Sequence, residues 1–224
     1  MQPSKMRNVT IPLTRTNTGR TTEGRLYGGG PRAVILSNMN TNDQDEWRPL
    51  LDPLLSKGFM VLTYDYIDPR SDQWEVLEDA LTFIRSQGAE RIVLIGASRG
   101  GVTSMQVLAR SDTTDDVVGA AAISAPVEHE GAVFFDDEEL KGIRQPKLLI
   151  NCEGDECAWG TRRMYELILE PKEMTFYPGD AHGTEIFAAH GELLVPKLVG
   201  FAESRLNAPS FMAFKPGLDL GYGR

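Results

Sequence analysis

Residues 92–101 read Ile-Val-Leu-Ile-Gly-Ala-Ser-Arg-Gly-Gly, an apolar run that leads through a glycine-flanked serine into a helical pattern. The apolar run predicts a buried strand, and residues 100–110 have the spacing of a helix. A sharp turn from strand to helix requires small residues around a serine that is held in strained backbone geometry. Gly96 and Gly100 meet this requirement. The stretch therefore predicts a strand, turn and helix with the Ser98 hydroxyl above one edge of a sheet.

Strand and helix patterns alternate on both sides of this turn. Continuous apolar runs predict further strands at 33–36, 59–64, 117–123, 148–150 and 174–177. Helical spacing predicts helices at 47–55, 76–84, 162–169 and 192–206, with a short acidic helix at 136–143. Alternating residues between 9 and 27 suit an antiparallel ribbon. Together these patterns predict an α/β fold, a three-layer α/β/α sandwich around a mostly parallel sheet with an antiparallel N-terminal edge.

Length and charge limit what the chain can be. Its 224 residues suit a single domain, which we expect to span 1–206, followed by an extended Pro/Gly-containing C-terminal arm at 207–224. The formal net charge of −9 opposes binding to phosphate backbones and anionic lipids, so we expect no nucleic acid and no membrane partner. No apolar leader follows Met1, and we expect a cytoplasmic protein. Cys152 and Cys157 are expected to be reduced, buried thiols, with neither a metal site nor a cofactor.

A serine hydroxyl becomes a nucleophile at neutral pH when an imidazole accepts its proton and a carboxylate holds that imidazole. His182 follows the predicted strand at 174–177, and Asp155 follows the one at 148–150. Both loops therefore open at the edge where Ser98 emerges. The residues leave alternatives open: Glu153 or Glu156 as the acid, His190 or His129 as the base, and Asp180 as a turn residue.

The G-x-S-x-G turn, with Ser98, Asp155 and His182 in that order, resembles the α/β-hydrolase fold family. The likeness extends from about residue 9 to 206 and suggests a small, lidless serine esterase or a dienelactone-hydrolase-like member. It implies that Ser98 is the nucleophile, that His182 acts as general base and then acid, and that Asp155 orients the histidine.

The resemblance also implies an oxyanion hole made of two backbone amides. One belongs to the residue after the nucleophile, here Arg99. The second comes from the loop after the third strand, where position favours Met39 and leaves Asn38 as the alternative. This loop lacks the His-Gly pair of many members of the family. Loop aromatics on the same edge are candidates for the pocket wall: Tyr66, Phe134, Phe135 and Trp159.

These features predict a serine hydrolase that cleaves a small carboxylic ester or thioester through an acyl-enzyme intermediate. Only about 22 residues separate Ala125 from Leu148, which leaves little room for a lid and favours small substrates. A ligand-binding protein without catalysis on the same scaffold stays open as an alternative, as does the oligomeric state. The glycine-rich turn also resembles the NAD(P)-binding loop of short-chain dehydrogenases, but Val102 stands at the last glycine position and no Tyr-x-x-x-Lys pair follows.

Overall fold

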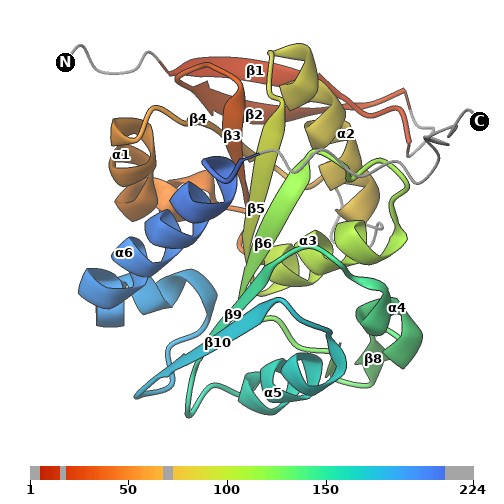
Figure 1. The fold of residues 1–224 in the computed structure, drawn as a ribbon, viewed down its shortest axis with the longest axis vertical. Helices are drawn as coiled ribbons and strands as arrows, with labels where there is room; N and C mark the ends of the chain where they lie inside the picture. Colours follow the sequence, from red (N-terminus) through yellow and green to blue (C-terminus); the bar gives the residue numbers. More distant parts are fainter. Residues whose placement is uncertain (1–5, 16–18, 68–72, 210–224) are drawn as a thin grey trace, which may run out of the picture.

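An eight-stranded sheet runs through the computed structural model, which describes residues 6–15, 19–67 and 73–209 (Figure 1). The strands follow the order β1-β2-β4-β3-β5-β6-β9-β10 across the sheet. Their bounds are β1 Arg7–Pro12, β2 Thr21–Tyr27, β3 Arg32–Ser37, β4 Met60–Tyr64, β5 Arg91–Ala97, β6 Val117–Ile123, β9 Lys147–Cys152 and β10 Lys172–Tyr177. Pairings from β4 to β10 are parallel, whereas β1 with β2 and β2 with β4 are antiparallel. The predicted mostly parallel sheet with an antiparallel N-terminal edge is confirmed.

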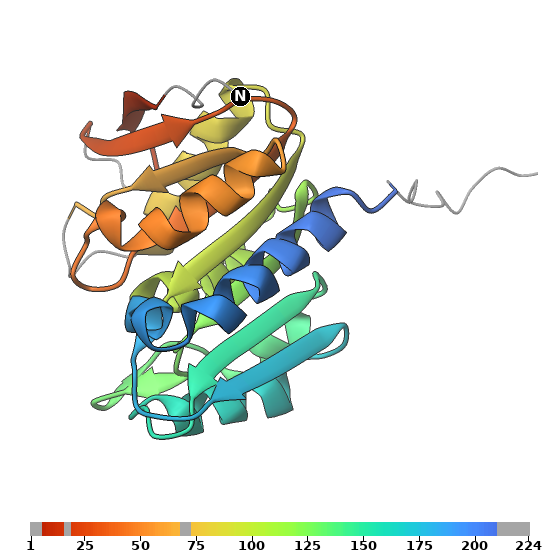
Figure 2. The same cartoon turned by 90° about the vertical axis from the view of Figure 1, so that its left-hand side faces the viewer.

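Helices cover both faces of the sheet (Figure 2). One face carries α1 (Arg48–Ser56) and α6 (Ile186–Leu206), each preceded by a short 3₁₀ helix, η1 (Gln44–Trp47) and η2 (Gly183–Glu185). The other face carries α2 (Gln73–Ser86), α3 (Arg99–Arg110), α4 (Asp137–Gly142) and α5 (Ala158–Leu167). A separate buried apolar cluster fills the space on each face. The predicted three-layer sandwich is therefore confirmed.

The strand β5, which leads to Ser98, is buried on both faces. Ile92 and Leu94 pack into the cluster under α2 and α3, while Val93 and Ile95 pack into the cluster under α1 and α6. Successive side chains of a strand point to opposite faces, so a strand between two helical layers must be apolar throughout. This packing fixes the end of β5 firmly at the middle of the sheet.

The structure corrects the bounds of several predicted elements. The last helix begins at Ile186 instead of residue 192, but a kink at His190, whose backbone is non-helical (φ −139°), separates its first residues from the part that was predicted. The helix α5 begins at Ala158 instead of residue 162. A two-stranded hairpin, β7 (Glu128–His129) and β8 (Ala132–Val133), was not predicted, since each strand is only two residues long. Most of the predicted C-terminal arm, from residue 210 onward, lies outside the described residues.

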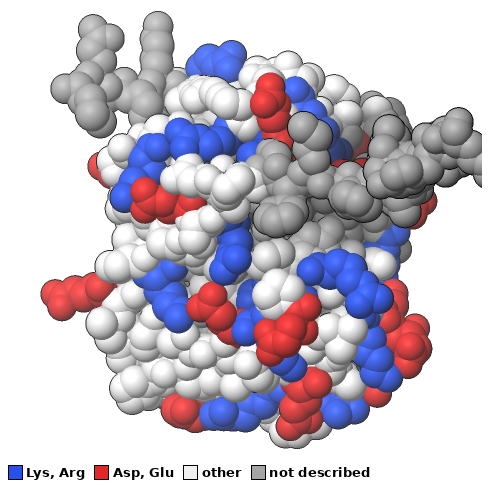
Figure 3. All heavy atoms as spheres, in the orientation of Figure 1, with Lys and Arg blue, Asp and Glu red and all other residues white. Residues whose placement is uncertain are grey.

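The segment between β6 and β9 is short. Residues 124–146, all of them described, contain only the β7–β8 hairpin and α4. On the side of the molecule seen in Figure 3, acidic and basic side chains are interspersed over the described surface. Within the described ranges, no helix combines the length and the apolar character that a membrane span requires.

Candidate functional site

Ser98 occupies the turn between β5 and α3 in a backbone conformation that most residues avoid. Its φ and ψ are 51° and −114°, and its N–H donates to the carbonyl oxygen of Ile123 at 2.7 Å. A Cβ atom on Gly96 would lie 2.1 Å from the Gly100 carbonyl oxygen, and one on Gly100 would lie 2.1 Å from that of Ser37. A backbone conformation like that of Ser98 costs about 1–3 kcal/mol, and such conformations cluster at functional sites. Gly96 and Gly100 therefore permit close contacts between backbone segments that any side chain would block, and the turn holds Ser98 above the sheet edge.

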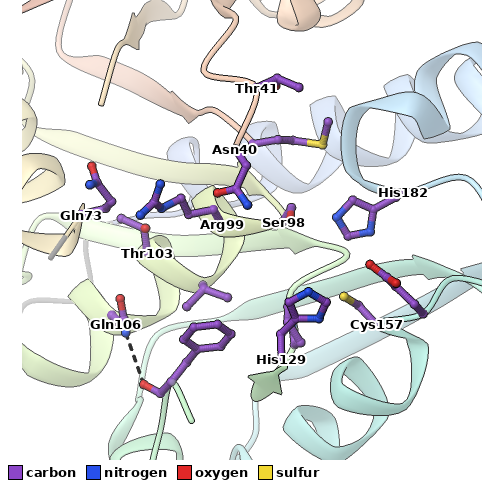
Figure 4. A pocket seen from close by; sticks show the side chains of 15 residues that line it. Asn40, Thr41, Gln73, Ser98, Arg99, Thr103, Gln106, His129, Cys157 and His182 are labelled. Carbon is purple, nitrogen blue, oxygen red and sulfur yellow. Dashed lines mark hydrogen bonds between the residues drawn. The ribbon is translucent and has the colours of Figure 1, made fainter. Parts of the chain in front are cut away.

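His182 and Asp155 form a hydrogen-bonded pair. The Nδ1 atom of His182 lies 2.9 Å from Oδ2 and 3.1 Å from Oδ1 of Asp155. The carboxyl group is buried, and its Oδ1 also accepts the N–H of Cys157 at 2.8 Å. A proton on Nδ1 that faces the carboxylate leaves Nε2 ready to accept another proton. The ring is directed toward the Ser98 side chain, and both residues line one cavity (Figure 4).

The contact shifts the pKa of both partners. Burial raises the pKa of Asp155, but the hydrogen bonds with His182 and from the Cys157 N–H outweigh it and leave this pKa below its usual range. The hydrogen bond to Asp155 raises the pKa of His182, against the opposing effect of burial. A carboxylate that remains ionised beside the ring stabilises the imidazolium that forms when the histidine takes a proton.

A buried polar network holds the histidine loop against the sheet. The Ser124 hydroxyl accepts the Gly183 N–H at 2.9 Å and donates to Asn151 Oδ1 at 2.8 Å. The Asn151 side chain in turn donates to Thr161 Oγ1 at 3.0 Å. These four side chains and amides come from the ends of β6 and β9, the start of α5 and the loop that carries His182. Sequence analysis missed this network, because its members are scattered and have no shared motif.

Met39 and Arg99, the predicted oxyanion donors, both line the cavity. Arg99 is the first residue of α3, so its N–H belongs to the helix-end amides that have no acceptor within the helix. Met39 follows β3, and its Sδ atom accepts the Thr184 N–H at 3.3 Å. This contact joins the loop after β3 to the loop that carries His182.

The cavity has a volume of about 780 Å³, within the range of small-molecule sites. Helix α3 supplies four of its wall residues at a spacing of three and four: Arg99, Val102, Thr103 and Gln106. Residues three and four apart share one face of a helix, so the sequence alone could have predicted this wall of the cavity. Gln73, from the start of α2, adds a polar side chain near this end of the cavity (Figure 4).

Of the aromatic and amide side chains predicted to line the pocket, Phe134 does so. The other four do not: Asn38, Tyr66, Phe135 and Trp159. Asn38 is fully buried and binds the Tyr64 carbonyl at 2.9 Å, and the Tyr66 hydroxyl donates to the Asn38 carbonyl at 2.8 Å. Phe135 packs in the core, and Trp159 is 61% exposed on α5. Loop position predicted the correct edge of the sheet but not the direction of each side chain.

Of the alternatives left open for acid and base, Glu156 and His129 also line this cavity, whereas Glu153 and His190 do not. Glu153 pairs with Arg162 on the surface, and the Glu156 carboxylate is exposed. His190 stacks on Tyr177 with ring centroids 5.2 Å apart. Its Nε2 lies 2.7 Å from a backbone carbonyl oxygen. In the described chain, the carboxylate that contacts a histidine ring is therefore that of Asp155.

Two groups of side chains carry donor atoms suited to a metal ion. The first is His129, Glu156 and Cys157, and the second is Asp155, Cys157 and His182. Within each group, the candidate ligand atoms lie within 4.8 Å of one another. Sequence analysis expected no metal site, because three histidines and two cysteines offer too few closely spaced ligands.

Comparisons with known proteins agree with the fold. The family model for the alpha/beta hydrolase family matches residues 29–212. The uncharacterized protein YfhR of Escherichia coli K12 is 25% identical over 201 residues, which span 78% of this chain and 71% of YfhR.

Solved structures with a similar fold include two esterases. The esterase domain of a Rhodothermus marinus protein superposes with a TM-score of 0.73 at 16% identity, over 90% of this chain and 99% of that domain. An esterase from Pyrococcus furiosus superposes with a TM-score of 0.76 at 16% identity, over 91% of this chain and 92% of the esterase. At such identities, the likeness shows the shared fold.

Proposed function

The chain belongs to the alpha/beta hydrolase family, and on that premise we propose that it is a serine hydrolase which cleaves a small carboxylic ester or thioester through an acyl-enzyme. One observation carries the proposal. His182 is bound to the buried carboxylate of Asp155 at 2.9 Å and faces Ser98, which is held in a strained turn at the same cavity. A nucleophile, a base and a group that orients the base are the parts that acyl transfer requires.

In the proposed reaction, the Ser98 oxygen attacks the acyl carbon while Nε2 of His182 takes the serine proton. The tetrahedral intermediate collapses, the bond to the leaving oxygen or sulfur breaks, and His182 gives its proton to the leaving group. Water then attacks the acyl-enzyme and passes a proton to His182, which returns it to Ser98 as the acid departs. The amides of Met39 and Arg99 stabilise the oxyanion in both steps.

Two features favour a substrate of modest size. The cavity of about 780 Å³ fits a small molecule, and the segment between β6 and β9 carries only a hairpin and α4. Long acyl chains need an extended apolar wall, whereas the end of this cavity near Gln73 and Gln106 is polar. We therefore expect short acyl groups to be hydrolysed faster than long ones.

Hydrolysis of p-nitrophenyl acetate, butyrate and octanoate tests the proposal. Ser98→Ala and His182→Ala should each lower kcat by about 10⁴-fold or more. Ser104→Ala is the control, because the Ser104 hydroxyl is buried and donates to the Gly100 carbonyl at 2.8 Å, on the helix side of the turn. Equal rates in the wild type and Ser98→Ala would refute the proposal.

A fluorophosphonate probe separates an enzyme from a binding protein on the same scaffold. Labelling that Ser98→Ala abolishes supports a nucleophilic serine, whereas a folded but unlabelled wild type favours ligand binding. Titration with NADH by fluorescence tests the dehydrogenase alternative, and we expect no binding.

A further inference from the structure

Three different metal-ligand side chains meet on one wall of the catalytic cavity. A ring nitrogen of His129, a carboxylate oxygen of Glu156 and the Cys157 sulfur lie within 4.8 Å of one another. His129 comes from β7, and the other two come from the loop between β9 and α5. Figure 4 shows the His129 ring beside the Cys157 sulfur. The two loops thus bring together donors that are far apart in the sequence.

The donors of this group are available for binding. Among the described residues, neither the His129 ring nor the Glu156 carboxylate has a hydrogen-bond or ion-pair partner. Asp155 differs, because its oxygens already bind His182 and the Cys157 N–H. A cation that took Asp155 as a ligand would have to break those bonds, so His129, Glu156 and Cys157 form the better site.

The donor set indicates the kind of ion. Imidazole nitrogen, thiolate sulfur and carboxylate oxygen are the ligands of Zn²⁺, at distances of about 2.0–2.3 Å from the metal. Ligand atoms in such a tetrahedron are then about 3.3–3.8 Å apart. Donors within 4.8 Å reach this geometry by small side-chain rotations, since Glu156 is exposed and His129 lies on a hairpin. Hard cations such as Mg²⁺ prefer all-oxygen sites and suit this set poorly.

We propose that His129, Glu156 and Cys157 bind a borderline-soft divalent cation of the Zn²⁺ type, and that the bound ion inhibits the hydrolase. The carboxylates of Asp155 and Glu156 make the surroundings of the sulfur negative. These negative charges attract a cation to the place where the sulfur lies.

Inhibition follows from the place of the site and rests on the function proposed above. All three donors line the cavity that holds Ser98 and His182, so an ion and its remaining water ligand would occupy substrate space. The Cys157 sulfur also lies within 4.8 Å of a His182 ring nitrogen. A cation there would repel the positive charge that His182 carries during the reaction.

Direct binding to the full chain tests the site without reference to activity. Equilibrium dialysis with ZnCl₂ should show one ion per chain. His129→Ala should weaken binding about tenfold or more, and Cys157→Ser should do the same. The matched controls are His190→Ala and Cys152→Ser, which should bind as the wild type does. With Co²⁺, the wild type should give a thiolate charge-transfer band that Cys157→Ser abolishes and Cys152→Ser retains.

A second measurement tests the inhibition. ZnCl₂ should lower ester hydrolysis by the wild type, excess chelator should restore it, and His129→Ala should need about tenfold more zinc for the same fractional loss. Each rate is compared with the metal-free rate of the same variant. Saturation without loss of hydrolysis would overturn the inhibition.

Other results would overturn the site itself. Absence of binding by dialysis would do so, as would equal affinity in the wild type and His129→Ala with loss only in His182→Ala, which would place the ion on the catalytic pair. Because dialysis needs no turnover, an inactive wild type that still binds zinc through His129 would refute only the proposed function.

Discussion

The Ser124 hydroxyl links the histidine loop to the sheet, and its removal should weaken both stability and catalysis. In Ser124→Ala, the buried Gly183 N–H would lose its acceptor at 2.9 Å. A buried donor left without a partner costs about 1–3 kcal/mol. Asn151 Oδ1 would lose less, because it still accepts the Cys152 N–H at 2.8 Å. We therefore expect the free energy of unfolding to fall by about 2 kcal/mol.

Urea denaturation measures this loss. With a slope of about 2 kcal/mol per molar urea, the midpoint should fall by about 1 M. Ser104→Ala is the control, since it also removes a buried hydroxyl but leaves the Gly100 carbonyl with its helical hydrogen bond, and we expect a loss of about 0.5–1 kcal/mol.

Catalysis provides a second readout that a purely structural role would not move. Gly183 directly follows His182, so loss of its anchor should misplace the imidazole and lower kcat about tenfold with little change in KM. The reasoning would be refuted if Ser124→Ala were no less stable than Ser104→Ala and retained the wild-type kcat.

Asp155→Asn should lower kcat by about 10⁴-fold, because the amide no longer holds the His182 proton on Nδ1 and so no longer leaves Nε2 free to accept one. In the wild type, activity should fall as the pH drops through a value above 6.5, because Asp155 raises the pKa of a base that must be neutral; a pH–rate limb below 6.5 would contradict this. Burial lowers the pKa of Lys147 from 10.5 to about 8, so the unfolded chain binds more protons between these values and wild-type stability should rise with pH across them. Lys147→Met buries no charge, so its free energy of unfolding should exceed that of the wild type by about 1–3 kcal/mol at pH 7. Urea titrations should show this difference become smaller by pH 10. Gly100→Ala should fail to fold, because its Cβ would lie 2.1 Å from a backbone carbonyl of β3, whereas Gly191→Ala in α6 meets nothing within 4 Å and should raise stability by about 0.5–1 kcal/mol. Thermal melts by circular dichroism check the glycine pair, and equal melting temperatures would count against this argument.

The fold was predictable because the central strands carry their signal locally. Residues such as Ile92 to Ile95 are apolar without interruption, and only a strand covered on both faces needs that pattern. The antiparallel edge was predictable for the complementary reason, since Val9, Ile11 and Leu13 alternate with polar residues in the sequence.

The candidate site was predictable only in part. Ser98 stands in a contiguous motif, and the loops of Asp155 and His182 follow strands whose ends must share an edge. Side-chain direction within a loop has no such local signal, so Tyr66 and Trp159 were assigned to a pocket that they do not line. The hairpin that presents His129 was missed, since strands of two residues leave no period to read.

The Ser124 link also bears on when the site comes into being during synthesis of the chain. A ribosome-bound chain that has released β5 and β6 already contains Ser98, but the loop that docks on Ser124 emerges later, after β10. Until the Gly183 N–H bonds the Ser124 hydroxyl, the loop that carries His182 is not anchored beside Ser98. In the proposed mechanism, a stalled or truncated product that lacks this loop would therefore carry Ser98 without its base.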